Sequence, residues 1–322
     1  MKAAIIGGPT QPAAYGDFAE PTTSDGGELV DLVAAGIHPV VRAIASGRHY
    51  ASSNHWPLIP GIDAVARTAT GELVYTGNIT TPYGTLAERM AISPGLRIPL
   101  PHGADPVQVA AGINPGLSSW LPLTARVSEI GTLGTVLVLG ATGIAGGLAV
   151  QNAFALGATR VVGVGRNRSA LAGVADHGAT TVALSGDKDA DAAAIGEGLA
   201  GDAPSIVLDF VWGAPAEATF AALARRGAGD DNADIAYVEI GSMAGADAVV
   251  PAALLRSRRI RMTGSGAGSS SISDIVVQLP AYLAMFAAGR VTVPVRTFPL
   301  SSAAEAWEAA AAGGKRMVIV PG

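Results

Sequence analysis

A glycine-rich segment, GATGIAGG at Gly140 to Gly147, constrains the fold of this chain more than any other feature. It directly follows the apolar run Thr135 to Leu139 and leads into the alanine-rich stretch Ala145 to Gln151. An apolar run, a glycine turn and a helical pattern in this order predict the first strand, turn and helix of a nucleotide-binding sheet. The free N–H groups at the start of that helix would face the phosphates of a nucleotide.

The three glycines of the spacing G-x-x-G-x-x-G have separate expected roles. Gly140 takes the tight turn, Gly143 lets the backbone approach a pyrophosphate, and Gly146 lets the helix pack on the strand. Glycine-rich turns also serve plain packing, so the motif alone leaves that reading open. The residues expected to contact a dinucleotide here are Gly140, Ala141, Thr142, Gly143, Ile144 and Ala145.

The next apolar run, Arg160 to Val164, ends in Gly165-Arg166-Asn167-Arg168, which we expect to contact the cofactor. A dinucleotide fold usually places an Asp or Glu here to accept a hydrogen bond from the ribose 2′-OH of NAD. No acid lies between Arg160 and Ala175. Because arginine holds an extra phosphate with paired, charge-assisted hydrogen bonds, the segment predicts NADPH rather than NADH. The alternative is that Arg166 and Arg168 are solvated surface charges.

Short apolar runs alternate with alanine-rich segments from Thr135 onward. Near-continuous apolar strands separated by helices indicate a parallel sheet covered on both faces, and six of them fit a doubly wound α/β dinucleotide fold. The strands are expected at 135–139, 160–164, 180–184, 205–210, 235–240 and 259–263, and the clearest helices at 145–156, 169–177 and 215–226.

The rest of the chain has a different texture. Residues 1–100 hold short β-like runs broken by many Pro and Gly residues, which suggests an irregular β-barrel-like unit. After a helix at about 273–289, the segments 291–298 and 317–320 resume this β-rich character around a helix at 303–312. A nucleotide domain at 119–267 is therefore expected to be inserted into a β-rich domain made of 1–118 and 268–322.

Composition excludes several classes of function. A formal net charge of −5 and a pI near 5.5 argue against a nucleic-acid partner or an anionic membrane surface. The absence of cysteine excludes disulfides, a thiolate nucleophile and a cysteine-ligated zinc. No window of about 20 apolar residues lacks Gly, Pro or charge. We expect a soluble, cytoplasmic protein that acts on a small molecule.

Several ordered segments carry a resemblance to a known family. They include AGIHP at Ala35 to Pro39, IPGID at Ile59 to Asp63, NPGLSSW at Asn114 to Trp120, the glycine turn, and GGKRMV at Gly313 to Val318. With them the chain resembles the medium-chain dehydrogenase/reductase superfamily, in its zinc-free quinone oxidoreductase-like branch. The resemblance implies a Rossmann domain, here doubly wound, inserted in a GroES-like β-rich catalytic domain, an active site in the cleft between the two, and a homodimer.

The resemblance also shows what the chain lacks. Zinc-dependent members bind catalytic zinc through Cys, His and Cys, and the matching positions here are His38, Ile62 and Asn114, with Asp63 beside Ile62. Isoleucine cannot ligate a metal, and two side chains do not make the usual site of three ligands. We therefore expect no metal site. Without a metal, hydride transfer needs an acceptor that is already electrophilic, such as a quinone or an α,β-unsaturated carbonyl, and a group that protonates it.

The resemblance implies a catalytic tyrosine shortly after a Gly in Gly47-Arg48-His49-Tyr50. Tyr50 is the first candidate, but the register is off by one, so His49 is an alternative and water is another. His38 is expected near the nicotinamide, and a satisfied buried histidine is the competing reading.

Three residues are predicted to line the substrate pocket, namely Asp63, Asn114 and Trp212. Asn114 would cap the helix that follows it or line the nicotinamide pocket, two compatible readings, and Trp212 would either wall the nicotinamide or fill the cleft. Ligands of such sheets sit at the carboxyl ends of the strands. The residues expected to contact the cofactor there are Phe210, Gly241, Ser242, Gly264 and Ser265.

Two other functions compete with a quinone or enone reductase. A short-chain reductase would have its glycine motif near the N-terminus and would contain a Tyr-x-x-x-Lys motif. In this chain the glycine motif begins at Gly140, and no Tyr-x-x-x-Lys motif occurs. A non-catalytic NADPH-binding protein, acting as a sensor or structural protein of the same fold, is not excluded, because binding a cofactor does not entail chemistry.

Overall fold

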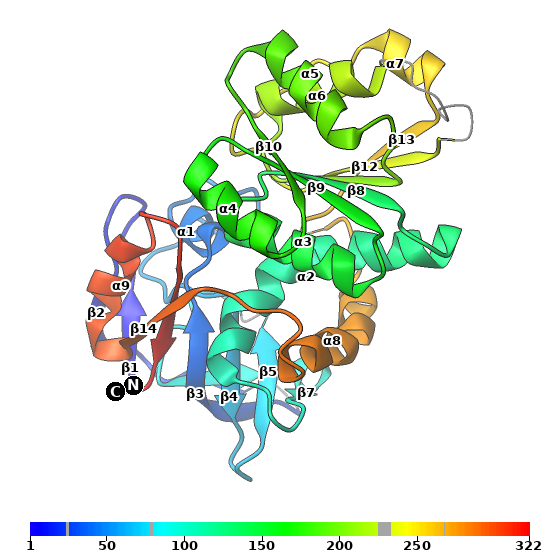
Figure 1. Ribbon diagram of the computed structural model, residues 1–322. Helices are drawn as coiled ribbons and strands as arrows, with labels where there is room; N and C mark the ends of the chain where they lie inside the picture. The colour runs from blue at the N-terminus through cyan, green and yellow to red at the C-terminus, as the bar shows by residue number, and fades with distance from the viewer. Residues whose placement is uncertain (24–25, 78–79, 225–232, 267) are drawn as a thin grey trace. The chain divides into compact units, whose positions relative to one another are not determined.

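The computed structural model describes residues 1–23, 26–77, 80–224, 233–266 and 268–322. These residues form two compact units, coloured along the chain in Figure 1. Unit 1 comprises Met1–Pro115 with Ile272–Gly322, and unit 2 comprises Gly116–Ser271. Helix α2 (Pro106–Ile130) contributes residues to both. No helix in the described ranges is long and apolar enough to cross a membrane.

Unit 2 is built on a parallel sheet whose strands lie in the order β10-β9-β8-β11-β12-β13. The order reverses between β8 and β11, as it does in doubly wound dinucleotide folds. The six strands are β8 (Thr135–Leu139), β9 (Arg160–Gly165), β10 (Thr180–Ala183), β11 (Ile206–Asp209), β12 (Ile235–Glu239) and β13 (Ile260–Gly264). This sheet confirms the predicted fold class, and each strand end lies within one residue of its expected position.

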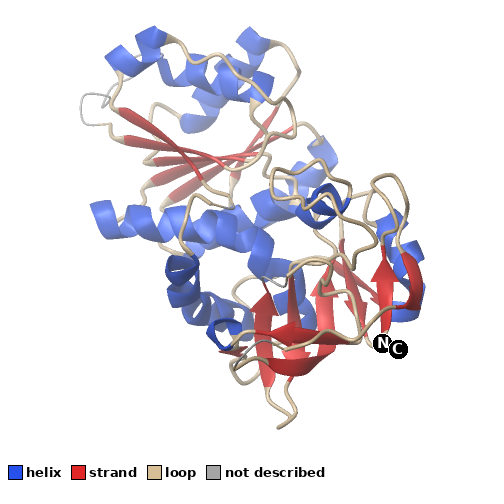
Figure 2. Ribbon diagram, turned by 180° about the vertical axis from the view of Figure 1, so that it is seen from behind, coloured by secondary structure: helices blue, strands red, loops and turns tan. Residues whose placement is uncertain are grey.

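Helices cover both faces of this sheet, as Figure 2 shows. Val136 and Val138 of β8 pack on one face with α3, and Leu137 and Leu139 pack on the other with α5 and α6. Because both faces are buried, the strands need apolar side chains at every position rather than at alternate ones. The helices are α3 (Ile144–Ala155), α4 (Arg168–Asp176), α5 (Lys188–Leu199), α6 (Gly213–Ala224) and α7 (Ala252–Ser257).

Unit 1 is β-rich and joins the two ends of the chain. Its larger sheet has the order β14-β15-β3-β4-β5-β7, with β6 paired to β3, and β1 and β2 form a second small sheet. The strands are β1 (Lys2–Ile5), β2 (Ala14–Asp17), β3 (Glu28–Gly36), β4 (Asp63–Arg67), β5 (Leu73–Gly77), β6 (Arg89–Ile92), β7 (Ile98–Pro99), β14 (Val295–Pro299) and β15 (Arg316–Val320). The helices are α1 (Pro39–Ala45), α8 (Ile272–Ala287) and α9 (Ala303–Ala309), with short 3-10 turns at Pro94–Leu96 and Leu300–Ser302.

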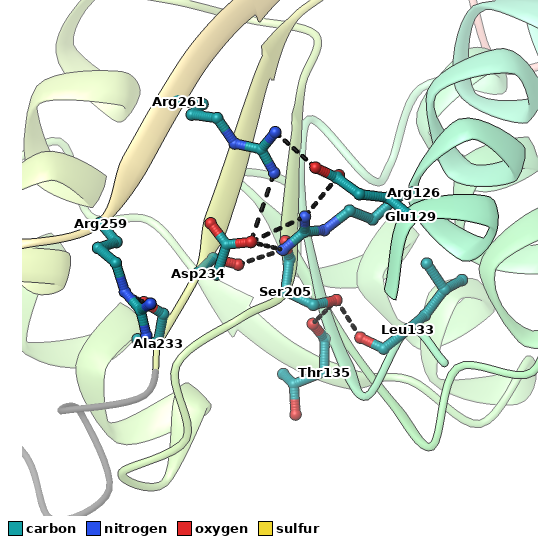
Figure 3. A network of polar contacts seen from close by, with 9 residues as sticks. All are labelled: Arg126, Glu129, Leu133, Thr135, Ser205, Ala233, Asp234, Arg259 and Arg261. Carbon is teal, nitrogen blue, oxygen red and sulfur yellow. Dashed lines mark hydrogen bonds and ion pairs between the residues drawn. The ribbon is translucent and has the colours of Figure 1, made fainter. Parts of the chain in front are cut away.

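A network of charged side chains joins α2 to the beginnings of β11, β12 and β13 (Figure 3). The Arg126 side chain is only 2% exposed. Its Nε donates to the carbonyl of Ser205 at 3.1 Å, and its terminal nitrogens contact Glu129 at 2.7 Å and the Asp234 carboxylate at 3.2 Å. Arg261, which is half exposed, bridges the same two carboxylates from the edge strand β13. Arg126 is therefore the buried member of the network, and it contacts both carboxylates as well as the Ser205 carbonyl.

We predict that Arg126→Met destabilises the protein by about 1–3 kcal/mol, because only the 2% exposed Arg126 also donates to the partly buried backbone carbonyls of Ser205 and Asp234. Arg261→Met is the matched control and should cost less, because its partners are solvated. Urea unfolding followed by circular dichroism measures both. An equal loss of unfolding free energy in the two variants would show that burial does not determine how much these contacts stabilise the protein.

The network also makes stability depend on pH. Hydrogen bonds from Arg261 and Arg126 lower the pKa of Glu129 to about 2, against an ordinary value of 4.5. Because the pKa is depressed in the folded state, the stabilisation is complete above pH 4.5 and is lost as the pH falls toward 2. We predict that Glu129→Gln is less stable than the wild type at about pH 7 and that this gap narrows as the carboxylate is protonated at acidic pH. A gap that stays constant into the acidic range in urea titrations would contradict this.

Candidate functional site

The turn between β8 and α3 requires glycine at two positions. Gly140 has a φ of +81°, and a Cβ there would lie 2.9 Å from Cγ1 of Val211. A Cβ on Gly146 would lie 2.2 Å from the carbonyl oxygen of Gly140, which is much closer than side chains tolerate. The turn conformation and the packing of α3 on β8 therefore account for these two glycines.

Gly143 differs from them because the protein itself does not require a glycine there. Its φ is −80°, and a Cβ would meet only the Gly140 carbonyl oxygen, at 3.4 Å. Gly143 is the N-cap of α3 and offers no side chain to the N–H groups of the first turn. By contrast, Asn167 and Asp187 cap α4 and α5 through their side chains. The start of α3 thus has no side-chain cap, as a pyrophosphate site requires.

The end of β9 presents two arginines beside this turn. Gly165 packs against Thr142, since a Cβ there would lie 2.7 Å from its Cγ2. Arg166 and Arg168 are exposed, and within the described part of the chain neither has an ion pair or side-chain hydrogen bond. Asn167 Oδ1 accepts hydrogen bonds from the N–H groups of Ser169 and Ala170. Asn167 therefore has a role in starting α4 that sequence reasoning did not assign.

The end of β11 is organised by Asp209, a buried acid to which sequence reasoning gave no role. Its Oδ1 accepts hydrogen bonds from the backbone N–H groups of Val211 and Trp212, both at 2.9 Å, and its Oδ2 accepts one from the Tyr237 hydroxyl at 2.6 Å. Trp212 has a φ of +53°, which is unusual for a residue with a side chain. In the sequence, this turn could have been found from Asp209, because an acidic residue ends an otherwise apolar strand there.

The Trp212 ring belongs to an aromatic cluster of unit 2. It makes edge contacts with Phe220 and Tyr237, at centroid distances of 5.9 Å and 6.2 Å. The Trp212 side chain is only partly buried, so these contacts cover part of its surface and leave the rest exposed.

Two acids at this edge of the sheet have raised pKa values. Burial raises the pKa of Asp209, and burial together with the charge of Asp209 raises the pKa of the neighbouring Glu239.

The other residues expected to contact the cofactor lie at the same edge of the sheet. Phe210 follows β11 and is buried, Gly241 and the exposed Ser242 follow β12, and Gly264 and Ser265 end or follow β13. A Cβ on Gly241 would lie 3.0 Å from the Phe210 carbonyl oxygen. The Ser265 hydroxyl donates to the Ser118 carbonyl at 3.0 Å, which ties this edge to α2.

Unit 1 contains a buried polar cluster around His38. The ring is 1% exposed, and its Nε2 lies 3.2 Å from Oδ1 of Asp63. The Tyr75 hydroxyl donates to Oδ2 of Asp63 at 3.0 Å, and Arg316 donates to the carbonyl of Ile37 at 2.9 Å. Burial lowers the pKa of His38 although Asp63 opposes the shift, so the ring is neutral near neutral pH. Burial also lowers the pKa of Arg316 to about 10.

The structure thus brings two predicted residues, His38 and Asp63, into contact. A Cβ on Gly36 would lie 2.7 Å from Cε1 of His38, so the glycine makes room for the ring. Sequence reasoning did not single out Tyr75 or give Arg316 a role, because they come from other strands. Among the described residues, no three His, Cys, Asp or Glu side chains gather as metal ligands would.

Asn114 does not cap a helix, which corrects one of the two readings for it. It lies inside α2, which begins at Pro106. Asp105 serves that beginning instead, because its Oδ1 accepts a hydrogen bond from the N–H of Val107 at 2.8 Å. Pro115, next to Asn114, also lies within the helix.

His49 and Tyr50 lie together in the loop that follows α1. Their rings stack with centroids 4.1 Å apart and planes tilted by 31°. Tyr50 is 75% exposed, and His49 is partly buried, which lowers its pKa. Both proton-donor candidates are therefore accessible, in contrast to His38.

Comparisons with known proteins found one curated relative and several solved structures of similar fold. No family model matches the chain. A curated protein of Emericella nidulans, named a probable NADPH-dependent quinone reductase, is 30% identical over 363 residues that cover all of both chains. A quinone oxidoreductase of Thermus thermophilus, solved also with NADPH, is 26% identical with a TM-score of 0.77 over 99% of this chain and 100% of that one. A mycobacterial quinone oxidoreductase is 20% identical, with a TM-score of 0.82 over the full length of both chains.

The chain is similar to the Emericella protein over its full length, and its doubly wound sheet is inserted into a β-rich unit. It therefore belongs to the medium-chain dehydrogenase/reductase superfamily, in its quinone oxidoreductase-like branch.

Proposed function

We propose that this protein is an NADPH-dependent, metal-independent reductase of quinones or other conjugated carbonyls. The observation that carries the proposal is the start of α3 behind Gly143, which lacks a side-chain cap, with two exposed arginines at the end of the adjacent strand. The Emericella and Thermus proteins, whose names or titles mention NADPH and quinone, support the same cofactor and acceptor class. A homodimer and a cytoplasmic location are part of the proposal.

The phosphates of the cofactor are assigned to two places in unit 2. The N–H groups of Ile144, Ala145 and Gly146 begin α3 and would donate to the pyrophosphate, which Gly143 admits. Arg166 and Arg168 would hold the 2′-phosphate, since a guanidinium pairs with phosphate through two hydrogen bonds. No acid in this segment repels that phosphate.

When bound, NADPH supplies a hydride, which carries two electrons to the acceptor. A quinone that takes up one hydride and one proton becomes a hydroquinone, so the chain must position the acceptor and allow one proton to reach it. Tyr50, His49 and water are the candidates for the proton, and Asn114 and Trp212 are proposed to line the acceptor site. His38 is buried against Asp63, and we assign this pair to holding the local structure rather than to proton delivery.

The activity can be measured directly. We expect NADPH oxidation with 1,4-benzoquinone, 9,10-phenanthrenequinone, 2-cyclohexenone or crotonyl-CoA, at rates that overnight dialysis against EDTA leaves unchanged. Elemental analysis of the dialysed enzyme serves as the control for metal removal. NADPH binding without turnover of any acceptor would favour the non-catalytic alternative, and activity restored only by zinc would refute metal independence.

Cofactor preference provides a second test. We predict that Arg166→Ala weakens NADPH binding about tenfold or more and NADH binding much less, because only NADPH carries the 2′-phosphate. Arg290→Ala replaces another exposed arginine, in unit 1, and is the matched control. Both dissociation constants follow from the change in nicotinamide fluorescence on binding. If the NADPH to NADH ratio is the same in Arg166→Ala and the wild type, the assignment of the 2′-phosphate is wrong.

A further inference from the structure

Two consecutive residues after β11 have positive φ angles, but only one of them is glycine. Gly213 has a φ of +59°, and a Cβ there would lie 2.9 Å from the Ala244 carbonyl oxygen. Trp212 before it has a φ of +53°. A bulky side chain makes this conformation unfavourable, whereas glycine adopts it freely. The turn would therefore form more easily with glycine at both positions.

The left-handed conformation of Trp212 is held by buried neighbours. In the described part of the chain, the groups that donate to the fully buried Asp209 are the N–H groups of Val211 and Trp212 and the hydroxyl of Tyr237. A buried carboxylate that is stabilised by uncharged donors rather than by a cation is costly. The turn thus contains two unfavourable features, a buried acid and a left-handed tryptophan.

These contacts give the Trp212 indole a fixed orientation. The ring makes edge contacts with Phe220 and Tyr237, and the remainder of the side chain is exposed. The Val211 carbonyl also accepts a hydrogen bond from the N–H of Ala244 at 2.7 Å, which holds the turn from the other side. An aromatic ring that is held in place and partly exposed can contact a ligand at low entropic cost.

The order of the strands indicates which half of the cofactor lies near this ring. β8 lies between β9 and β11. The pyrophosphate is assigned to the turn after β8, and the 2′-phosphate, which belongs to the adenosine half, to Arg166 and Arg168 after β9. The nicotinamide half then extends to the other side of β8, over the end of β11, which Trp212 follows.

We propose that Asp209 is a positioning residue for cofactor binding: with Tyr237, it holds Trp212 in the left-handed conformation that presents the indole to the nicotinamide half of NADPH. The indole makes the contact, and Asp209 acts through it. This explains why the turn contains a strained tryptophan and a buried acid where glycine alone would suffice. The inference rests on the proposed function, in which Trp212 borders the acceptor site, and adds the residues that place the indole there.

The first part of the test separates the ring from the turn. NADPH binding is titrated by nicotinamide fluorescence, and stability is measured by urea unfolding. Trp212→Gly and Trp212→Ala should both raise the dissociation constant of NADPH about tenfold, because both remove the indole. The urea midpoint should be higher in Trp212→Gly, because glycine adopts a positive φ without strain.

Ala200→Gly is the matched control for backbone strain. Ala200 also has a φ of +53° and lies just after α5 in unit 2. Its replacement by glycine should raise the urea midpoint and leave the dissociation constant of NADPH unchanged, because no cofactor contact is assigned to this residue.

The second part tests whether Asp209 acts through Trp212. Asp209→Ala should raise the dissociation constant about tenfold, and Asp209→Asn should stay within about threefold of the wild type, because its amide oxygen can accept from the same two N–H groups. In the double variant Asp209→Ala/Trp212→Gly, glycine forms the turn without the acid. Its urea midpoint should exceed that of Asp209→Ala, while its dissociation constant should equal that of Trp212→Gly. Should Asp209→Ala fail to fold, the comparison of the double variant with Trp212→Gly still decides.

Two fragments of the cofactor identify the half that the indole contacts. Reduced nicotinamide mononucleotide and adenosine 2′,5′-bisphosphate are titrated calorimetrically into the wild type and Trp212→Gly. The variant should bind the first more weakly and the second equally well. Weakened binding of the adenosine fragment alone would overturn the assignment to the nicotinamide half.

Two further results would overturn the role of Asp209. One is NADPH binding by Trp212→Gly with wild-type affinity, which would leave the indole without a ligand. The other is a double variant that binds NADPH more weakly than Trp212→Gly, which would show that Asp209 acts independently of the indole. The expected pattern of binding in an enzyme that reduces no acceptor would instead refute the proposed function and support the positioning role.

Discussion

The backbone contact between α3 and the end of β8 is the constraint on which the candidate cofactor site depends. A Cβ on Gly146 would lie 2.2 Å from the Gly140 carbonyl oxygen, so only glycine lets the helix begin this close to the strand. The close contact places the first turn of α3 at the carboxyl edge of the sheet. Phe210 and Val211, from the end of β11, pack against Gly140 at the same point, where the strand order reverses.

The six strands of unit 2 could be predicted from sequence to within one residue, because the information was local. The expected helix at 215–226 matches α6 up to Ala224, and its last two positions lie outside the described residues. Strands buried on both faces are near-continuous apolar runs, and glycines and alanine-rich helices separate them. Unit 1 was harder, since its larger sheet pairs β3 with β15, and Val318 faces Gly36 across that pairing. No local pattern identifies such a partner, so the sequence indicated β-rich character without the strand order.

The candidate site divides in the same way. The glycine turn and the arginines after β9 are short motifs whose spacing implies a ligand. By contrast, Asp63 has two further partners besides His38, namely Tyr75 from β5 and Arg316 from β15. Tyr237 likewise reaches Asp209 from the neighbouring strand. The capping role considered for Asn114 failed because α2 already begins at Pro106, so Asn114 lies in the interior of the helix. Tertiary neighbours decide such cases.

The pairing of β15 with β3 also has a consequence for how the protein is made. Unit 2 ends at Ser271, so its sheet can close while β14 and β15 are still being synthesised, a delay of about 3–10 s at roughly 5–20 residues per second. Until then the edge of β3 is unpaired, and His38 and Asp63 lack Arg316. The newborn chain therefore passes through a stage in which one half is folded and the other exposes a sheet edge, the period in which chaperones would matter most.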